Sequence, residues 1–152
     1  MMSVLASSHS GLPRGPQLRI VDAEASAEKG QDDCADNVTT DDRDESWISG
    51  RKAPAHIDLD LGRTQNVGTV DLLPYQVPTP AETCHRIWVG SSRDDMKMVA
   101  EVRQETAHHK WVTGVPIEQA ARYLRIETVE HPGWVAWSGI KVYGSGDNAD
   151  AK

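Results

Sequence analysis

The chain of 152 residues is long enough for one domain of ordinary size with a hydrophobic core. Its 16 Lys and Arg residues stand against 23 Asp and Glu residues, which gives a formal net charge of −7. Dispersed negative charge without a basic run argues against a nucleic-acid backbone or an anionic membrane surface as the main partner. No apolar stretch is long enough to cross a bilayer, so no membrane insertion is expected.

Composition divides the chain into one folded unit and two flexible ends. Residues 1–16 are rich in Ser, Gly and Pro and predict a disordered leader. Residues 146–152 predict a polar, disordered tail. The folded domain is therefore expected over residues 17–145.

Alternation of apolar and polar residues predicts strands throughout this domain. In residues 56–62 three apolar side chains alternate with Asp58 and Asp60, which places both carboxylates on the opposite, solvated face. The other predicted strands are residues 18–23, 67–73, 85–91, 96–102, 111–115, 122–129 and 139–144. Residues 25–28 and 116–121 are expected to form single helical turns. About eight short strands without a long helix predict an all-β, antiparallel sandwich or barrel.

An acidic segment precedes Trp47. Asp41, Asp42, Asp44 and Glu45 place four carboxylates within five residues. A solvated acidic loop is one interpretation. The other is a calcium loop, because calcium takes six to eight oxygen ligands, although the spacing does not match the helix-loop-helix calcium pattern.

The cysteines and histidines give no clear metal or catalytic motif. Cys34 and Cys84 are expected as two free thiols, with a single bridge as the alternative. The pair His108 and His109 predicts a solvated turn rather than a zinc site, since adjacent strand residues point to opposite faces. No nucleophile, phosphate-loop or zinc-protease motif is present, and no catalysis is expected.

Five motifs occur in an order that is similar to a known family. They are Asp41–Trp47, Ile57–Gly62, Val89–Asp94, Ala121–Ile126 and Ile140–Gly144. This order resembles the discoidin domain, also called the coagulation factor five/eight (F5/8) type C domain, and most of all its bacterial relatives, the family 32 carbohydrate-binding modules. The resemblance covers about residues 18–144.

The resemblance implies a galactose-binding-like jelly-roll β-sandwich with ligand loops at one end, a lectin-like role and no catalysis. It also implies a structural calcium ion near Asp41 or Asp42 and Glu45, although the Glu that relatives supply from the last strand is Gly139 here. Relatives that bind galactose often carry Arg after a Pro, where this chain has Tyr75. The resemblance therefore does not identify the sugar.

A sugar site needs an exposed aromatic ring for the apolar face of the sugar and fixed polar groups for its hydroxyls. The Pro-Gly-Trp sequence in residues 131–137 predicts a loop that exposes Trp134 and buries Trp137, so Trp134 is the expected platform, with Tyr75 as the alternative. The polar partners are expected among Arg51, Lys52, Gln76, His85 and His131. The three remaining tryptophans, Trp47, Trp88 and Trp111, are expected in the core.

We therefore predict a non-catalytic β-sandwich that binds a glycan through its end loops. The alternative is a protein-interaction or assembly module of the same fold, with another protein or an attached enzyme domain as its partner. A hydrolase that uses Asp58 and Asp60 is disfavoured, because a solvated outer face explains both residues. No secretory signal is present, so the location stays open, and it would be extracellular if the chain is an excised carbohydrate-binding module.

Overall fold

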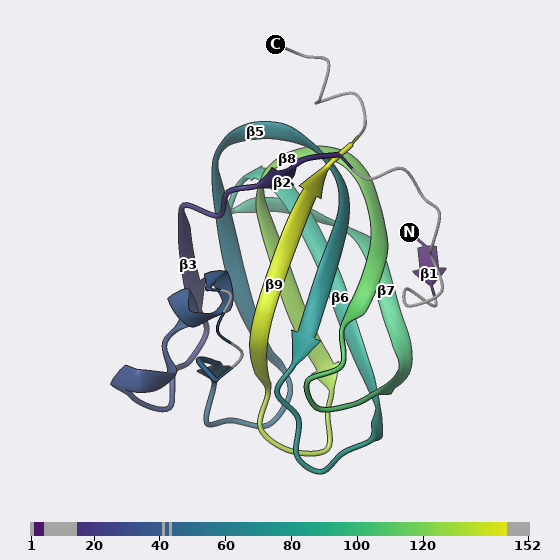
Figure 1. Ribbon diagram of the computed structural model, residues 1–152. Coiled ribbons are helices and arrows are strands. Elements are labelled where there is room, and N and C mark those ends of the chain that lie inside the picture. Colours follow the sequence, from purple (N-terminus) through teal and green to yellow (C-terminus); the bar gives the residue numbers. More distant parts are fainter. Residues whose placement is uncertain (1, 5–14, 41, 43, 146–152) are drawn as a thin grey trace.

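The computed structural model describes residues 2–4, 15–40, 42 and 44–145, and these form a β-sandwich with two short 3-10 helices (Figure 1). The strands are β1 (Met2–Val4), β2 (Gln17–Leu18), β3 (Asp22–Ala25), β4 (Trp47–Ile48), β5 (Ala55–Pro74), β6 (Ala81–Ser92), β7 (Asp95–Thr106), β8 (Val112–Glu130) and β9 (Ala136–Gly144), and the 3-10 helices are η2 (Gln31–Asp33) and η3 (Ala35–Thr39). Neither described helix is long and apolar enough to span a membrane.

Two long strands, β5 and β8, bend over and contribute to both layers of the sandwich (Figure 1). Their pairing shifts register between Asp60 and Gln65, and Gly62 supplies a φ of +84° within this bend. The first half of β5 pairs with β3, and its second half pairs with β9. Neighbouring strands are antiparallel, apart from the parallel pair of β1 and β7. The expected antiparallel jelly-roll sandwich is confirmed.

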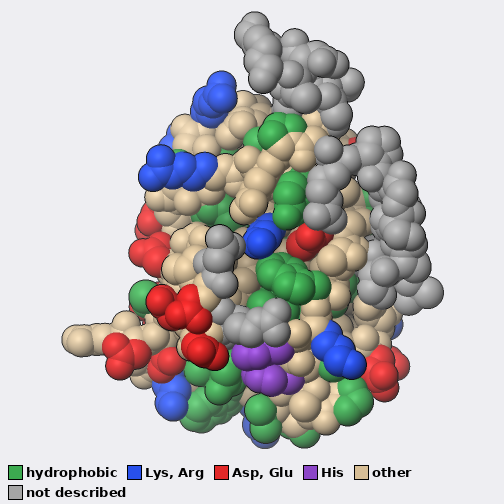
Figure 2. Space-filling view, viewed as in Figure 1, with side chains coloured by type: hydrophobic (Ala, Val, Ile, Leu, Met, Phe, Trp, Pro, Cys, Tyr) green, Lys and Arg blue, Asp and Glu red, His purple; other side chains and the backbone are tan. Residues whose placement is uncertain are grey.

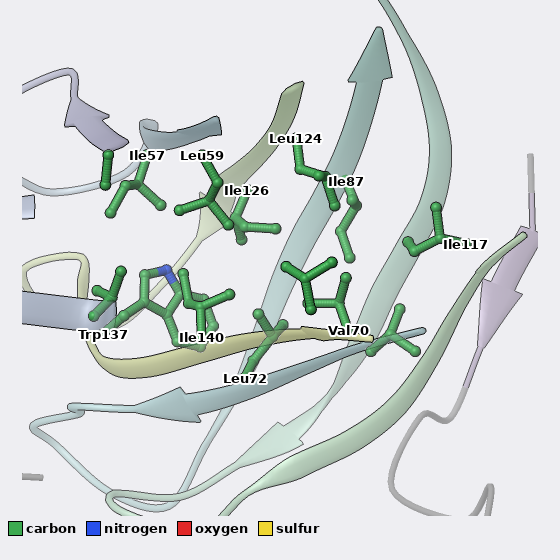
Figure 3. Packing of buried hydrophobic residues seen from close by; sticks show 14 of the residues in the cluster. Ile57, Leu59, Val70, Leu72, Ile87, Ile117, Leu124, Ile126, Trp137 and Ile140 are labelled. Carbon is green, nitrogen blue, oxygen red and sulfur yellow. The ribbon is translucent and has the colours of Figure 1, made fainter. Parts of the chain in front are cut away.

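The hydrophobic core lies between the two layers (Figure 3). In one layer Ile57, Ile126 and Ile87 are neighbours across β5, β8 and β6. In the facing layer Leu72 of β5 is the register partner of Ile140 of β9. Each of these side chains is at most 2% exposed, and burial of one such side chain stabilises the fold by about 1.5–3 kcal/mol.

Both expected helical turns are wrong. Residues 116–121 belong to strand β8, in which Pro116 pairs with Thr69 and Ile117 is buried in the core. Glu118 has a φ of +51°, so a local irregularity of the strand, rather than a helix, follows Pro116. Residues 25–28 continue from β3, and the Ser26 N–H donates to the His56 carbonyl of β5 (2.9 Å).

The tryptophans divide between the core and the outer faces of the sandwich. Trp47 is fully buried, as expected. Trp88, on β6, and Trp111, just before β8, are half-buried instead. Trp88 Nε1 donates to Glu127 (3.1 Å), and the Trp111 ring lies against Gly139.

The outer face of β5 carries ion pairs rather than free carboxylates. Arg125 donates two hydrogen bonds to Asp58 (2.7 and 2.9 Å), and Arg122 donates two to Asp60 (3.0 and 3.2 Å). Asp58 is only 5% exposed, so the expectation of two solvated carboxylates is wrong for it. Both aspartates are therefore paired with arginines of β8, which agrees with a structural role for Asp58 and Asp60.

The sandwich has two different ends. Residues 49–54, 75–80, 107–111 and 131–135 connect strands at one end, the lower end in Figure 1. At the other end the first and last parts of residues 15–145 lie side by side, because the Gly15 N–H donates to the Gly144 carbonyl (3.1 Å). Within the expected leader, Met2–Val4 pairs with β7, and the expected tail lies outside the described residues.

Candidate functional site

Two neighbouring loops, residues 49–54 and 131–135, are joined by backbone hydrogen bonds at the loop end. The Ser49 N–H donates to the Val135 carbonyl, and the Val135 N–H donates to the Arg51 carbonyl (3.0 Å each). A Cβ on Gly133 would clash with the Val77 carbonyl oxygen, so the 131–135 loop also lies directly against the 75–80 loop. Arg51, Trp134 and Val77 are thus brought to one surface.

Trp134 is the exposed aromatic residue of this surface. Its side chain is 47% exposed, whereas Trp137, three residues later, is 1% exposed and packs beside the His85 ring (4.8 Å between ring centroids). The expected division into one exposed and one buried ring is confirmed. Val77, on the neighbouring loop, is 67% exposed. The loop end therefore presents apolar side chains that the fold leaves uncovered.

A hollow of about 510 Å³ lies beside the Trp134 ring. Its lining residues are Ser26, Ala27, Glu28, Lys29, Ser49, Gly50, Arg51 and Trp134. The Lys29 ammonium lies 5.4 Å from the centroid of the Trp134 ring, within the range of a cation–π contact. The sequence interpretation found Trp134 and Arg51 but not Lys29, because no motif links residues so far apart in the chain.

Residues 26–29 form one rim of the hollow, and each is fixed to the sandwich by a hydrogen bond. The Ser26 hydroxyl accepts from the His56 N–H, and the Ala27 carbonyl accepts from Trp47 Nε1 (3.0 and 2.8 Å). The Glu28 carboxylate accepts from the Ala35 N–H, and the Lys29 N–H donates to the Ile48 carbonyl (2.7 and 2.8 Å). Gly50 has a φ of +70° and lies against Lys29, where no side chain would fit easily.

Two of the predicted polar partners lie inside the protein. Gln76 is 1% exposed, and its side chain bonds to the Thr106 hydroxyl and carbonyl (2.6 and 3.0 Å). His85 is 2% exposed, and its two ring nitrogens bond to Thr128 and Thr83 (2.8 and 2.9 Å). Burial lowers the pKa of His85 to about 3, so the ring is neutral at physiological pH. Because their polar groups are already paired, neither residue enters the site proposed below.

His131 and Tyr75 are half-buried and lie at different places on the loop end. His131 Nδ1 lies within hydrogen-bond distance of the Gly133 backbone, where it shapes the turn before Trp134. Burial lowers its pKa. The Tyr75 ring contacts the edges of His108 and His109 (5.0 and 6.1 Å). The two aromatic candidates therefore do not share one hollow.

The histidines around Tyr75 form a stacked pair. The rings of His108 and His109 are 3.8 Å apart with an interplanar angle of 20°. His109 Nε2 bonds to the Ser138 hydroxyl, and His108 Nδ1 accepts from the Gln76 N–H (3.0 Å each). Figure 2 shows histidine side chains together near the loop end, close to acidic and basic side chains. Across the described residues, no group of three or more His, Cys, Asp and Glu side chains is placed to hold a metal ion.

The acidic loop is closed by its own hydrogen bonds in the part that the structure describes. The Asn37 amide donates to the Asp32 and Ser46 carbonyls (2.8 and 2.9 Å), and the Asp42 carboxylate accepts from the Asp44 N–H (2.9 Å). These hydrogen bonds engage the Asn37 amide and the Asp42 carboxylate within the loop itself.

The rest of the predicted calcium set lies only partly within the described residues. Glu45 is exposed, Asp41 lies outside the described residues, and Gly139 faces Trp111. The calcium site stays a prediction, and a change in melting temperature on adding a chelator would test it. Cys34 and Cys84 are both free thiols in the structure.

Comparison of the structure with solved structures finds carbohydrate-binding modules. A family 32 module of the Clostridium perfringens protein CpGH89, solved with GalNAc-β-1,3-galactose, superposes with a TM-score of 0.74 at 16% identity, covering 84% of this chain and 99% of the module. The family 32 module of Clostridium perfringens NanJ, solved with galactose, gives 0.69 at 18% identity, with 84% and 98% covered.

A third module, from the protein AlyQ, was solved with 4,5-unsaturated mannuronic acid. It gives a TM-score of 0.69 at 21% identity, with 83% of this chain and 96% of the module covered. No family model matches the sequence. No curated protein matches it either. At these identities the superpositions establish architecture rather than ligand, and the chain has the galactose-binding-like β-sandwich fold of the family 32 carbohydrate-binding modules.

Proposed function

We propose that this protein is a non-catalytic module that binds a glycan in the hollow beside Trp134. The observation that carries the proposal is the exposure of the Trp134 ring at the rim of a hollow whose walls are fixed to the sandwich. A ring that is left uncovered can pack against the C–H face of a sugar, and burial of that apolar surface favours binding.

The surrounding polar groups fit the rest of a sugar. Lys29 and Arg51 each bring hydrogen-bond donors to the hollow, and both residues lie on segments held by backbone hydrogen bonds. A rigid site loses little conformational entropy when a ligand binds. The fold gives further support, since modules of this architecture have been solved with bound saccharides.

The proposal is tested by binding of the full chain to a glycan array. We expect Trp134→Ala to weaken retention on the bound glycans at least about tenfold, because the apolar contact with the sugar is lost. Val21→Ala is the matched control, since Val21 is 50% exposed and does not line this hollow. Thermal unfolding of both variants checks that they remain folded.

An array profile that Trp134→Ala leaves unchanged would contradict the proposal. Absence of glycan binding, together with a stable complex in a pull-down or sizing experiment, would favour the alternative of a protein-interaction module of the same fold.

A further inference from the structure

We infer that the glycan bound beside Trp134 is acidic, with a carboxylate or sulfate group that contacts Lys29 and Arg51. This inference rests on the proposed function and adds the class of ligand. It comes from two basic side chains of the hollow, Lys29 and Arg51, which form no ion pair with a described carboxylate, whereas five arginines elsewhere do.

Five arginine side chains outside the hollow are neutralised by carboxylates. Among the described residues, ion pairs with carboxylates of β3, β5, β7 or β8 are formed by Arg86, Arg93, Arg103, Arg122 and Arg125. Arg122 and Arg125 each donate two hydrogen bonds to one aspartate. These donors are already engaged by the fold.

Around Trp134 the basic side chains lack such partners. Lys29, Arg51 and the adjacent Lys52 are exposed, and within the described ranges none of the three lies within ion-pair distance of a carboxylate. Lys29 contacts the Trp134 ring instead. On a chain with a net charge of −7, a group of unpaired cations beside an exposed ring is the arrangement that an acidic sugar would neutralise.

The acidic residues near the hollow do not cancel this positive charge. Glu28 is the carboxylate in its lining, and its Oε2 already accepts the Ala35 N–H (2.7 Å). Asp32 and Asp33 follow Lys29 in the chain but do not line the hollow. The hollow is therefore lined by two cations and one hydrogen-bonded carboxylate, which favours an anionic ligand over a neutral one.

The test compares three oligosaccharides of equal length with the full chain by calorimetry: an oligogalacturonate, a sulfated galactan and a neutral galactan. We expect at least one acidic oligosaccharide to bind about tenfold more tightly than the neutral one, with an affinity that falls as NaCl rises, because salt screens exposed charges. The two acidic probes distinguish a carboxylate from a sulfate as the recognised group.

The variants are Lys29→Gln and Arg51→Gln, with Arg63→Gln and Lys97→Gln as controls. Arg63 and Lys97 are also exposed and form no ion pair with a described carboxylate, but they do not line the hollow. Each site variant should weaken binding of the acidic oligosaccharide about tenfold, through the loss of a charge-assisted hydrogen bond. Each control should leave it unchanged, and Arg51→Lys should retain part of the affinity.

Equal binding of the neutral galactan that requires Trp134 but not Arg51 would overturn the inference and leave the proposed function intact. Loss of binding that is the same in the site variants and the controls would also overturn it, since it would indicate general attraction to charge. Absence of Trp134-dependent binding to any saccharide would instead remove the proposed function itself.

Discussion

His85 lies in a chain of hydrogen bonds that can run in only one direction. The Gln76 Oε1 atom cannot donate, so the Thr106 hydroxyl must donate to it (2.6 Å). Thr106 then accepts from Thr83, and Thr83 accepts from His85 Nε2. His85 Nδ1 is left to accept from the Thr128 hydroxyl (2.8 Å). The chain thus requires a proton on His85 Nε2, and burial, which lowers the pKa of His85 to about 3, leaves Nδ1 without one.

Protonation of His85 should destabilise the fold at acidic pH. Its pKa is about 3 in the folded protein, below the ordinary value of 6.5, so at pH values between these limits the unfolded chain binds a proton that the folded chain does not. Stability is therefore lost as the pH falls from about 6.5 towards 3, by an amount on the order of 4 kcal/mol.

Urea unfolding at neutral and acidic pH measures this loss. We expect His85→Gln to be less stable at neutral pH but to lose less stability on acidification than the unmodified chain. The carboxylates and other histidines are common to both proteins, so the difference between them reports His85. If the stability of the two proteins fell in parallel as the pH is lowered, protonation of His85 would not be the cause of the loss.

At the scale of single residues, the sequence shows which side chains are polar but not which of them have partners. Gln76 and His85 were predicted as polar partners of a sugar because both side chains can form hydrogen bonds. Their partners, Thr106 and Thr128, come from strands far away in the chain, so their pairing could not be seen in advance. Asp58 was expected to face solvent for the same reason, because its partner Arg125 lies 67 positions away in the chain.

At the scale of elements, alternation predicted the inward faces of the strands well, because a buried face of a strand repeats every two residues. It did not show that residues 56–62 and 67–73 belong to one strand. Gly62 and the register shift after Asp60 bend β5 without ending it, and the same sequence features are typical of a turn. The helical turn predicted at residues 116–121 was wrong for a similar reason, since proline occurs at the first position of helices as well as at irregularities of strands.

The contact between the 131–135 and 75–80 loops leads to a prediction about Gly133. A Cβ at this position would clash with the Val77 carbonyl oxygen, so Gly133→Ala should push the two loops apart and displace Trp134. We expect weaker glycan retention on the array with little change in the melting temperature, because the core is not touched. Gly30→Ala is the control, since its Cβ would lie 3.7 Å from the nearest side-chain atom, Asp33 Oδ2. Equal retention by both variants would contradict this view of the loops.

Two residues of the hollow, Trp134 and Arg51, could be predicted from the sequence. Trp134 is flanked by Gly133 in a loop, and this local composition indicates exposure. Arg51 precedes the predicted strand of residues 56–62. Lys29 was not predicted, because its position depends on contacts with Gly50 and with the Ile48 carbonyl of β4. These residues become its neighbours only when the chain folds.

At the scale of the whole molecule, the two cysteines lie in different environments, so their thiols are expected to react at different rates. Cys34 is partly exposed and lies near Asn37 (3.6 Å from Sγ to Oδ1). Cys84 is fully buried on β6 and donates to the Glu101 carboxylate (3.3 Å). Burial, with this hydrogen bond, raises the pKa of the Cys84 thiol to about 11. A thiol that is both covered and protonated reacts slowly.

Thiol labelling of the native protein should therefore be biphasic. We expect Cys34 to react rapidly and Cys84 to react only as fast as the sandwich unfolds, because the layers share β5 and β8 and cannot open separately. Measurement of labelling by mass spectrometry over time, with Cys34→Ser as the control, checks this. Rapid labelling of the Cys34→Ser variant would show that Cys84 is accessible without global unfolding.

The hydrogen bond between Gly15 and Gly144 bears on how the protein is oriented when it is attached to something else. It places Gly15 and Gly144 next to each other, at the pole opposite the 131–135 loop (Figure 1). A tag, a surface or another folded unit attached at this pole would leave the loops of the proposed glycan site directed away from the attachment. The sandwich would then act as a spacer and, under the proposed function, hold its loops towards a polymer at a distance from the attachment.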